Sequence, residues 1–122
     1  MHLLDTSVLV GVLRKDPAAL AWFASNAAGA KASVISWTEL YVGIRRQNEE
    51  RDIVAIERLV QPLAVDRDIA ARAGVFVRHY GPSHSVEIPD ALIAATAEHH
   101  ALRLATLNVK HFPMFPKLRR AY

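Results

Sequence analysis

The stretch that decides the fold is the N-terminal segment MHLLDTSVLVGVL, residues 1–13. Leu3 and Leu4 form a short apolar pair that is typical of a buried strand. The apolar residues at positions 8–13 then favour a helix that follows this strand. Asp5 therefore lies where a strand passes into a helix, and a carboxylate at that junction calls for an explanation.

Composition narrows the possible classes of protein. The chain has 122 residues and 52% of them are hydrophobic, so we expect one domain over residues 1–122 with a real core. The absence of cysteine excludes disulfides, thiolate metal sites and a cysteine nucleophile. We also expect a cytoplasmic protein without membrane contact, because we find neither a leader pattern nor an apolar stretch of membrane-spanning length.

Strand and helix patterns alternate along the rest of the chain. Further strands are predicted at residues 31–35, 62–65 and 102–105. Helices are predicted at residues 18–28 after Asp16 and Pro17, at 49–60, at 67–79, and after Pro89. This alternation predicts an α/β fold, a three-layer α/β/α sandwich with a central, mostly parallel sheet.

Local signals predict where several of these helices begin and end. Ser36 to Glu39 match a capping box that would open a helix, and Thr6 or Ser7 could cap the first helix. Gly81 and Pro82 are expected to end the helix over 67–79, followed by a polar loop at 83–87. The tail from residue 112 is expected to be irregular or a weak edge strand.

Four polar side chains lie at the junctions where a parallel sheet would gather a site. Asp5 and Asn108 follow strands, Glu39 lies one helical turn beyond a strand, and Asp90 lies in the first turn of a helix. Taken singly, each acid has a structural explanation, as a cap, a capping-box residue or a partner of a helix dipole. Together they favour one rim, because ligands bind at the carboxyl ends of parallel strands.

Three carboxylates placed together repel one another, and this repulsion destabilises the fold. A bound cation removes the repulsion. Oxygen ligands without cysteine favour Mg²⁺, with Mn²⁺ as a substitute. The chemistry that follows is hydrolysis of a phosphodiester by metal-activated water.

Positive charge is concentrated in two places. The chain carries 15 Lys and Arg against 12 Asp and Glu, which permits a nucleic-acid partner without requiring one. Arg45 and Arg46 form one cluster, and Lys117, Arg119 and Arg120 form another. These clusters are either ordinary solvated faces or contacts for RNA phosphates.

The sequence resembles the PIN-domain ribonucleases and, within them, the VapC toxins of toxin–antitoxin pairs. The resemblance spans the chain and is carried by Leu4-Asp5-Thr6-Ser7, Ser36-Trp37-Thr38-Glu39-Leu40, the segment from Pro89 to Ala97, and the segment from Ala105 to Phe112. It implies a Mg²⁺-dependent endoribonuclease inhibited by a small antitoxin that enters the active-site groove. It implies Asp5 and Asp90 as metal ligands, and Glu39 as a ligand directly or through water. It further implies Thr6, Ser7 and Thr106 as supporting hydroxyls.

One position departs from the family pattern. Many members carry a fourth acid near the last motif, where this chain has Asn108 and His111. We therefore expect one well-held ion in the free protein, with a second arriving alongside RNA. Two alternatives remain open, a PIN-type nuclease that processes RNA outside a toxin system and a non-catalytic binding module. The apolar helical faces also suggest a homodimer.

Overall fold

The computed structural model describes residues 1–122 and contains one four-stranded parallel sheet. The strands are β1 (His2–Leu4), β2 (Lys31–Ser33), β3 (Gln61–Leu63) and β4 (Arg103–Ala105), in the order β3-β2-β1-β4. All three pairings are parallel, and Leu4 of β1 lies opposite Ala105 of β4. The predicted α/β class and parallel sheet are confirmed.

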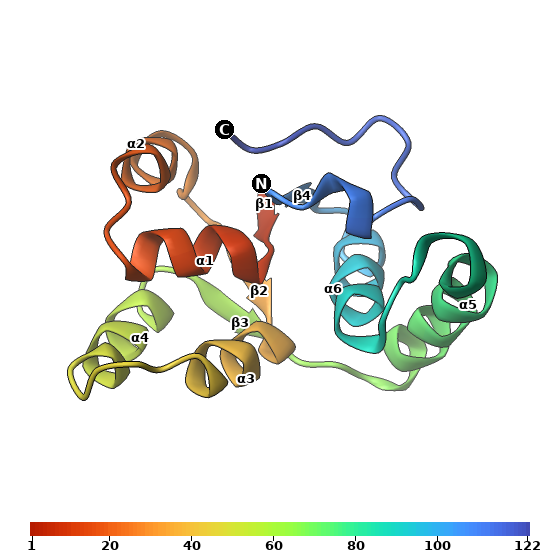
Figure 1. Ribbon diagram of the computed structural model, residues 1–122, viewed down its shortest axis with the longest axis horizontal. Helices are drawn as coiled ribbons and strands as arrows, with labels where there is room; N and C mark the ends of the chain where they lie inside the picture. The colour runs from red at the N-terminus through yellow and green to blue at the C-terminus, as the bar shows by residue number, and fades with distance from the viewer.

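Helices surround this sheet (Figure 1). Before β3 the chain forms α1 (Thr6–Leu13), α2 (Pro17–Asn26), α3 (Val34–Val42) and α4 (Glu49–Glu57). After β3 it forms α5 (Arg67–His84), α6 (Ile88–His99) and the 3₁₀ turn η1 (Val109–His111). The tail beyond residue 112 has no regular structure, as predicted. No helix combines the length and the apolar character needed to cross a bilayer.

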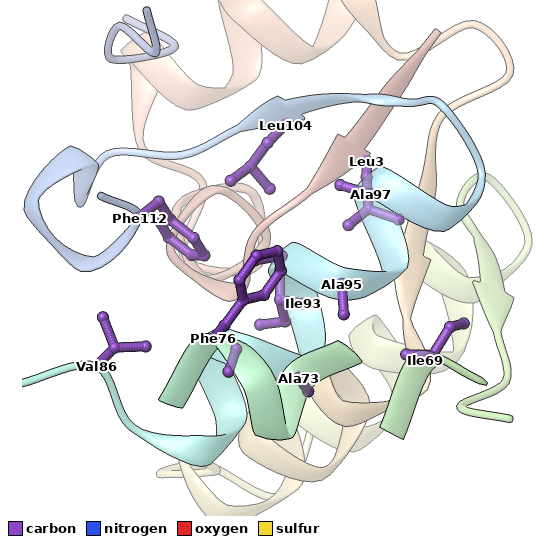
Figure 2. Close-up of a cluster of buried hydrophobic side chains, with 12 residues drawn as sticks. Leu3, Ile69, Ala73, Phe76, Val86, Ile93, Ala95, Ala97, Leu104 and Phe112 are labelled. Carbon is purple, nitrogen blue, oxygen red and sulfur yellow. The ribbon is translucent and has the colours of Figure 1, made fainter. Parts of the chain in front are cut away.

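The two faces of the sheet carry separate cores, because neighbouring residues of a strand point to opposite faces. Leu3 packs into a core with α5 and α6, in which Phe76, Ile93 and Phe112 are buried (Figure 2). Leu4 packs into the other core, which is built from α1, α3 and α4. Asp5, the next residue, therefore leaves the sheet between these two layers.

The capping-box prediction at Ser36–Glu39 was wrong. The helix α3 begins two residues earlier, at Val34, and its N-cap is Ser33, whose hydroxyl accepts a hydrogen bond from the Ile35 N–H at 3.2 Å. The predicted strand over 31–35 is correspondingly shorter. An earlier start places Ser36, Trp37 and Leu40 in the core, and that burial outweighs the strand preference of Val34 and Ile35.

Other helix limits also differ from the predictions. Asp5, and not Thr6 or Ser7, caps α1. The α5 helix continues through Pro82 to His84, because a proline in the exposed last turn removes only one backbone hydrogen bond. Its C-cap is Ser85, which is in the left-handed conformation with φ 54°.

The remaining differences are small. Helices α2 and α4 end at Asn26 and Glu57, so each is shorter than predicted, and α6 begins at Ile88, so Pro89 occupies its second position.

Candidate active site

The four side chains that the sequence placed at one rim line a single pocket of about 490 Å³. It lies at the carboxyl ends of β1 and β4, beside the first turns of α1 and α6 and the middle of α3. The structure thus brings together Asp5, Glu39, Asp90 and Asn108. Thr6, Ser7, Glu87 and His111 also line the pocket, whereas Thr106 lies buried behind Asp5.

Asp5 is the most constrained of the acids. Asp5 is only 4% exposed. Its Oδ1 accepts a hydrogen bond from the Thr6 N–H at 2.8 Å, and this contact caps α1. Oδ2 accepts the hydroxyls of Ser7 at 2.8 Å and of Thr106 at 2.7 Å. Three donors fix the direction of this carboxylate. Asp5 therefore acts as both a helix cap and a fixed oxygen ligand.

Thr6 connects Asp5 to Glu39. Its hydroxyl donates to Glu39 Oε1 at 2.7 Å, and it lies 2.9 Å from the hydroxyl of the fully buried Ser36. Thr6 Oγ1 is the donor in both contacts, so its one proton is shared between Ser36 Oγ and Glu39 Oε1. These contacts connect Glu39 to the first turn of α1 and orient its carboxylate.

Asp90 carries the strongest electrostatic signal. The pKa of its carboxyl is raised from 3.8 to about 6, mainly by burial and to a smaller extent by the charges of Asp5, Glu39 and Glu87. The nearby His111, whose Nδ1 lies 3.2 Å from Asp90 Oδ2, works in the opposite direction and lowers this pKa. The pocket therefore concentrates negative charge that its own groups neutralise only in part.

This pKa predicts how stability depends on pH. The folded protein binds the Asp90 proton more tightly than the unfolded chain, so the stability of the metal-free protein should fall as pH rises from about 4 to about 6. A pKa shift of about two units corresponds to about 3 kcal/mol in the free energy of unfolding. The Asp90 side chain is 24% exposed, and screening by solvent reduces this effect to about 2 kcal/mol.

Urea unfolding in chelator, at a series of pH values, measures this dependence. We compare the wild type with Asp90→Asn, because subtracting the two curves removes the contribution of the histidines other than His111, which contacts Asp90. Superimposable pH profiles would show that the Asp90 carboxyl has an ordinary pKa.

The last predicted motif surrounds Thr106. The Asn108 N–H donates to the Thr106 hydroxyl at 2.9 Å, and the Leu107 N–H donates to Ser7 Oγ at 3.1 Å. The Asn108 side chain makes no capping hydrogen bond, so its amide oxygen is free to face the pocket. These contacts join the segment after β4 to the first turn of α1.

Sequence reasoning missed three residues of this site. Glu87 directly precedes α6, and its side chain makes no capping hydrogen bond. Its charge adds to the negative charge around Asp90. Ser36 was assigned to a capping box, and its true role appears only with the shifted start of α3. His111 lies within the last motif, and the fold alone reveals its closeness to Asp90.

The predicted basic residues do not reach this pocket. Arg45 and Arg46 line a separate, smaller pocket at the far ends of α1 and α3. Lys117, Arg119 and Arg120 line a third cavity, of about 630 Å³, between the tail, β4 and Trp22.

The residues present fit a hard divalent cation through water. The pocket offers carboxylate, amide and hydroxyl oxygens, and burial together with the neighbouring acids raises the pKa of Asp90. No three acidic or histidine side chains lie close enough to form a complete ligand set. Mg²⁺ does not need one, because it keeps several of its waters and takes one or two carboxylates directly.

The fold and the pocket together indicate the class of protein to which this chain belongs. A parallel sheet with an acidic pocket at the carboxyl ends of its strands defines an α/β domain with a candidate active site at that edge. The sequence model of the PIN-domain family matches residues 2–116, so the chain belongs to this family.

Curated relatives and solved structures agree with this assignment. Ribonuclease VapC10 of Mycobacterium tuberculosis H37Rv is 42% identical, over 98% of this chain and 91% of its own length. Ribonuclease VapC19 of the same strain is 39% identical over the full length of both. A toxin–antitoxin complex from Klebsiella pneumoniae superposes with a TM-score of 0.85 at 26% identity, covering 100% of this chain and 98% of that one.

A more distant structure shares the fold. DNA-bound VapBC from Salmonella typhimurium has a TM-score of 0.76 at 23% identity, over 98% of this chain and 95% of that one.

Proposed function

We propose that this chain is a Mg²⁺-dependent endoribonuclease that acts in the cytoplasm as the toxin of a toxin–antitoxin pair. The observation that carries the proposal is the meeting of Asp5, Glu39 and Asp90 at one pocket of a PIN fold. The relatives named as ribonucleases, at 42% and 39% identity, support RNA as the substrate.

Each side chain has a defined task in this proposal. Asp5 and Asp90 hold the cation, and Glu39 contacts it directly or through water. When bound, Mg²⁺ supplies a nucleophilic hydroxide and neutralises charge on the phosphate. Ser7 and Thr106 keep the Asp5 carboxylate pointed at the pocket, and Thr6 does the same for Glu39. Asn108 offers an uncharged oxygen in place of a fourth acid.

Cleavage of purified RNA tests this function. The protein should cut single-stranded RNA in Mg²⁺ or Mn²⁺ and leave single-stranded DNA of the same sequence intact. Cleavage of neither polymer would reject the enzyme and favour a binding module.

The candidate active-site pocket supports an antitoxin partner, and a separate apolar surface supports a second copy of the chain. A basic segment of a partner protein would offset the charges of Asp5, Glu39 and Glu87, which add to the effect of burial on the Asp90 pKa, as a metal would. Tyr41 and Val42 of α3 are 41% and 83% exposed, and we propose this apolar surface as the homodimer contact. Mass measurement in solution, with and without a co-expressed partner, tests both assemblies.

Metal binding should also stabilise the fold without any RNA present. At a free Mg²⁺ concentration of ten times Kd, the folded state gains about 1.4 kcal/mol, which raises Tm by about 5 °C. Differential scanning fluorimetry measures the shift.

Two variants show where that metal binds. Glu39→Gln should reduce the Mg²⁺-induced shift, whereas Glu50→Gln should keep it, because Glu50 lies in the first turn of α4 outside the pocket. Equal shifts in both variants would place the metal elsewhere.

A further inference from the structure

A second pocket, of about 190 Å³, lies at the carboxyl ends of α1 and α3 and is rich in positive charge. Four cationic side chains line it, Arg14, Lys15, Arg45 and Arg46, against two acids, Glu49 and Asp52. We call it the basic pocket. None of the four cations has a carboxylate within 4.0 Å, although the protein forms such pairs elsewhere. The basic pocket therefore holds positive charge that no group of the protein neutralises directly.

We call the pocket lined by Asp5, Glu39 and Asp90 the acidic pocket. The basic pocket and the acidic pocket lie at opposite ends of the seam along which α1 packs against α3. At the acidic end, Thr6 of α1 donates to Glu39 of α3 at 2.7 Å. At the basic end, Arg14 Nη2 approaches the Gly43 carbonyl at 3.5 Å. The eight residues of α1 separate the ends by about 12 Å. Both helices run from the centre of the molecule towards the side where α4 lies (Figure 1).

Lys15 shows that a side chain is retained here at a conformational cost. Its φ is +59°, in the left-handed region, directly after the α1 C-cap Arg14. Glycine is the usual residue at this position of a helix end, because it has no side chain to strain. Ser85 and Ala101 have the same conformation after α5 and α6, so the backbone alone does not require a ligand, but it makes glycine a compatible substitution at position 15.

Helix dipoles favour cations here, because Arg14 and Lys15 directly follow the last turn of α1, and Arg45 and Arg46 follow the α3 C-cap Gly43. A helix end carries only about half of a negative charge, so the dipoles do not replace an anion. The buried Glu49 is already occupied, because its Oε2 accepts the Arg45 backbone N–H at 3.4 Å. The arginine and lysine head groups thus remain available to an anion.

We propose that the basic pocket binds phosphate groups of the RNA strand a few nucleotides from the bond that is cleaved. This inference rests on the proposed ribonuclease function and specifies where the substrate strand runs, along the seam between α1 and α3. Arginine and lysine bind phosphates without reading the bases, so the basic pocket orients the strand and raises affinity for every sequence.

Binding of a labelled single-stranded RNA of about 20 nucleotides tests the proposal. Affinity is measured in chelator, so that the strand is not cut, over a range of salt concentrations. Each lost phosphate contact should lower the slope of log K against log salt by about 0.7, and affinity at 0.1 M salt by about five-fold. We therefore expect Lys15→Gly to bind about five-fold more weakly, and Arg45→Gln with Arg46→Gln about 20-fold more weakly.

Two comparisons separate a binding role from a structural one. Lys15→Gly relieves the left-handed strain, so its Tm should equal or exceed that of the wild type while its RNA affinity falls. The matched control, Arg67→Gln with Arg78→Gln, removes the same charge from exposed positions on α5 and should bind RNA as the wild type does.

Other outcomes overturn the proposal. If the wild type cuts RNA and the basic-pocket variants bind RNA with unchanged affinity and salt slope, the strand takes another path while the enzyme stands. If those variants keep RNA affinity but lose binding of polyglutamate, the basic pocket serves an acidic protein segment instead. If the wild type neither binds nor cuts RNA, the proposed function fails together with this inference.

Discussion

Asp90→Asn should abolish RNA cleavage and at the same time stabilise the metal-free protein. In the proposed function Asp90 is one of two direct metal ligands, and loss of such a ligand would remove several kcal/mol of transition-state stabilisation, so the rate should fall at least about 1000-fold. In the absence of metal, the same change removes a half-buried charge whose pKa is raised to about 6. The free energy of unfolding at pH 7 should therefore rise by about 2 kcal/mol.

Single-turnover cleavage and urea unfolding in chelator measure these two effects. The matched control is Asp68→Asn, because Asp68 occupies the first turn of α5 as Asp90 occupies that of α6, but it is exposed. The control should keep its cleavage rate. A folded Asp90→Asn protein with full activity would remove Asp90 from the active site.

Asp5→Asn should also abolish cleavage, but with the opposite effect on stability. The Asp5 carboxylate caps α1 and accepts the hydroxyls of Ser7 and Thr106, so an amide at this position disturbs a buried network. We expect a loss of about 2 kcal/mol in the free energy of unfolding and a rate at least about 1000-fold lower.

Unfolding and cleavage assays again separate the two roles. Asp16→Asn is the control, since Asp16 caps α2 through the Ala19 N–H at 3.0 Å and lies outside the acidic pocket. If Asp5→Asn is as stable as the wild type and as active, the hydrogen-bond network has no functional role.

The sequence was sufficient for the sheet and for most of the acidic pocket. Short apolar strands followed by polar junctions are local signals, and a parallel sheet gathers such junctions at one edge. For that reason Asp5, Glu39, Asp90 and Asn108 could be placed together before any contact was known. Their roles as ligands remain predictions that the variants above test.

The errors arose where packing over long sequence distances decides the structure. The start of α3 depends on burying Trp37 and Leu40 against other helices, which a local capping pattern does not report. His111 lies 21 positions from Asp90 in the chain, yet their side chains meet at 3.2 Å. Arg14 and Lys15 likewise join Arg45 and Arg46 only because α1 and α3 run side by side.

The cleavage rate of one RNA as a function of Mg²⁺ concentration tests the central claim most directly. We expect no cleavage in chelator, and a rate that saturates over the same concentrations of Mg²⁺ that raise Tm, because a single acidic pocket accounts for both. A rate that does not depend on Mg²⁺ or Mn²⁺ would contradict a metal-dependent ribonuclease at Asp5, Glu39 and Asp90.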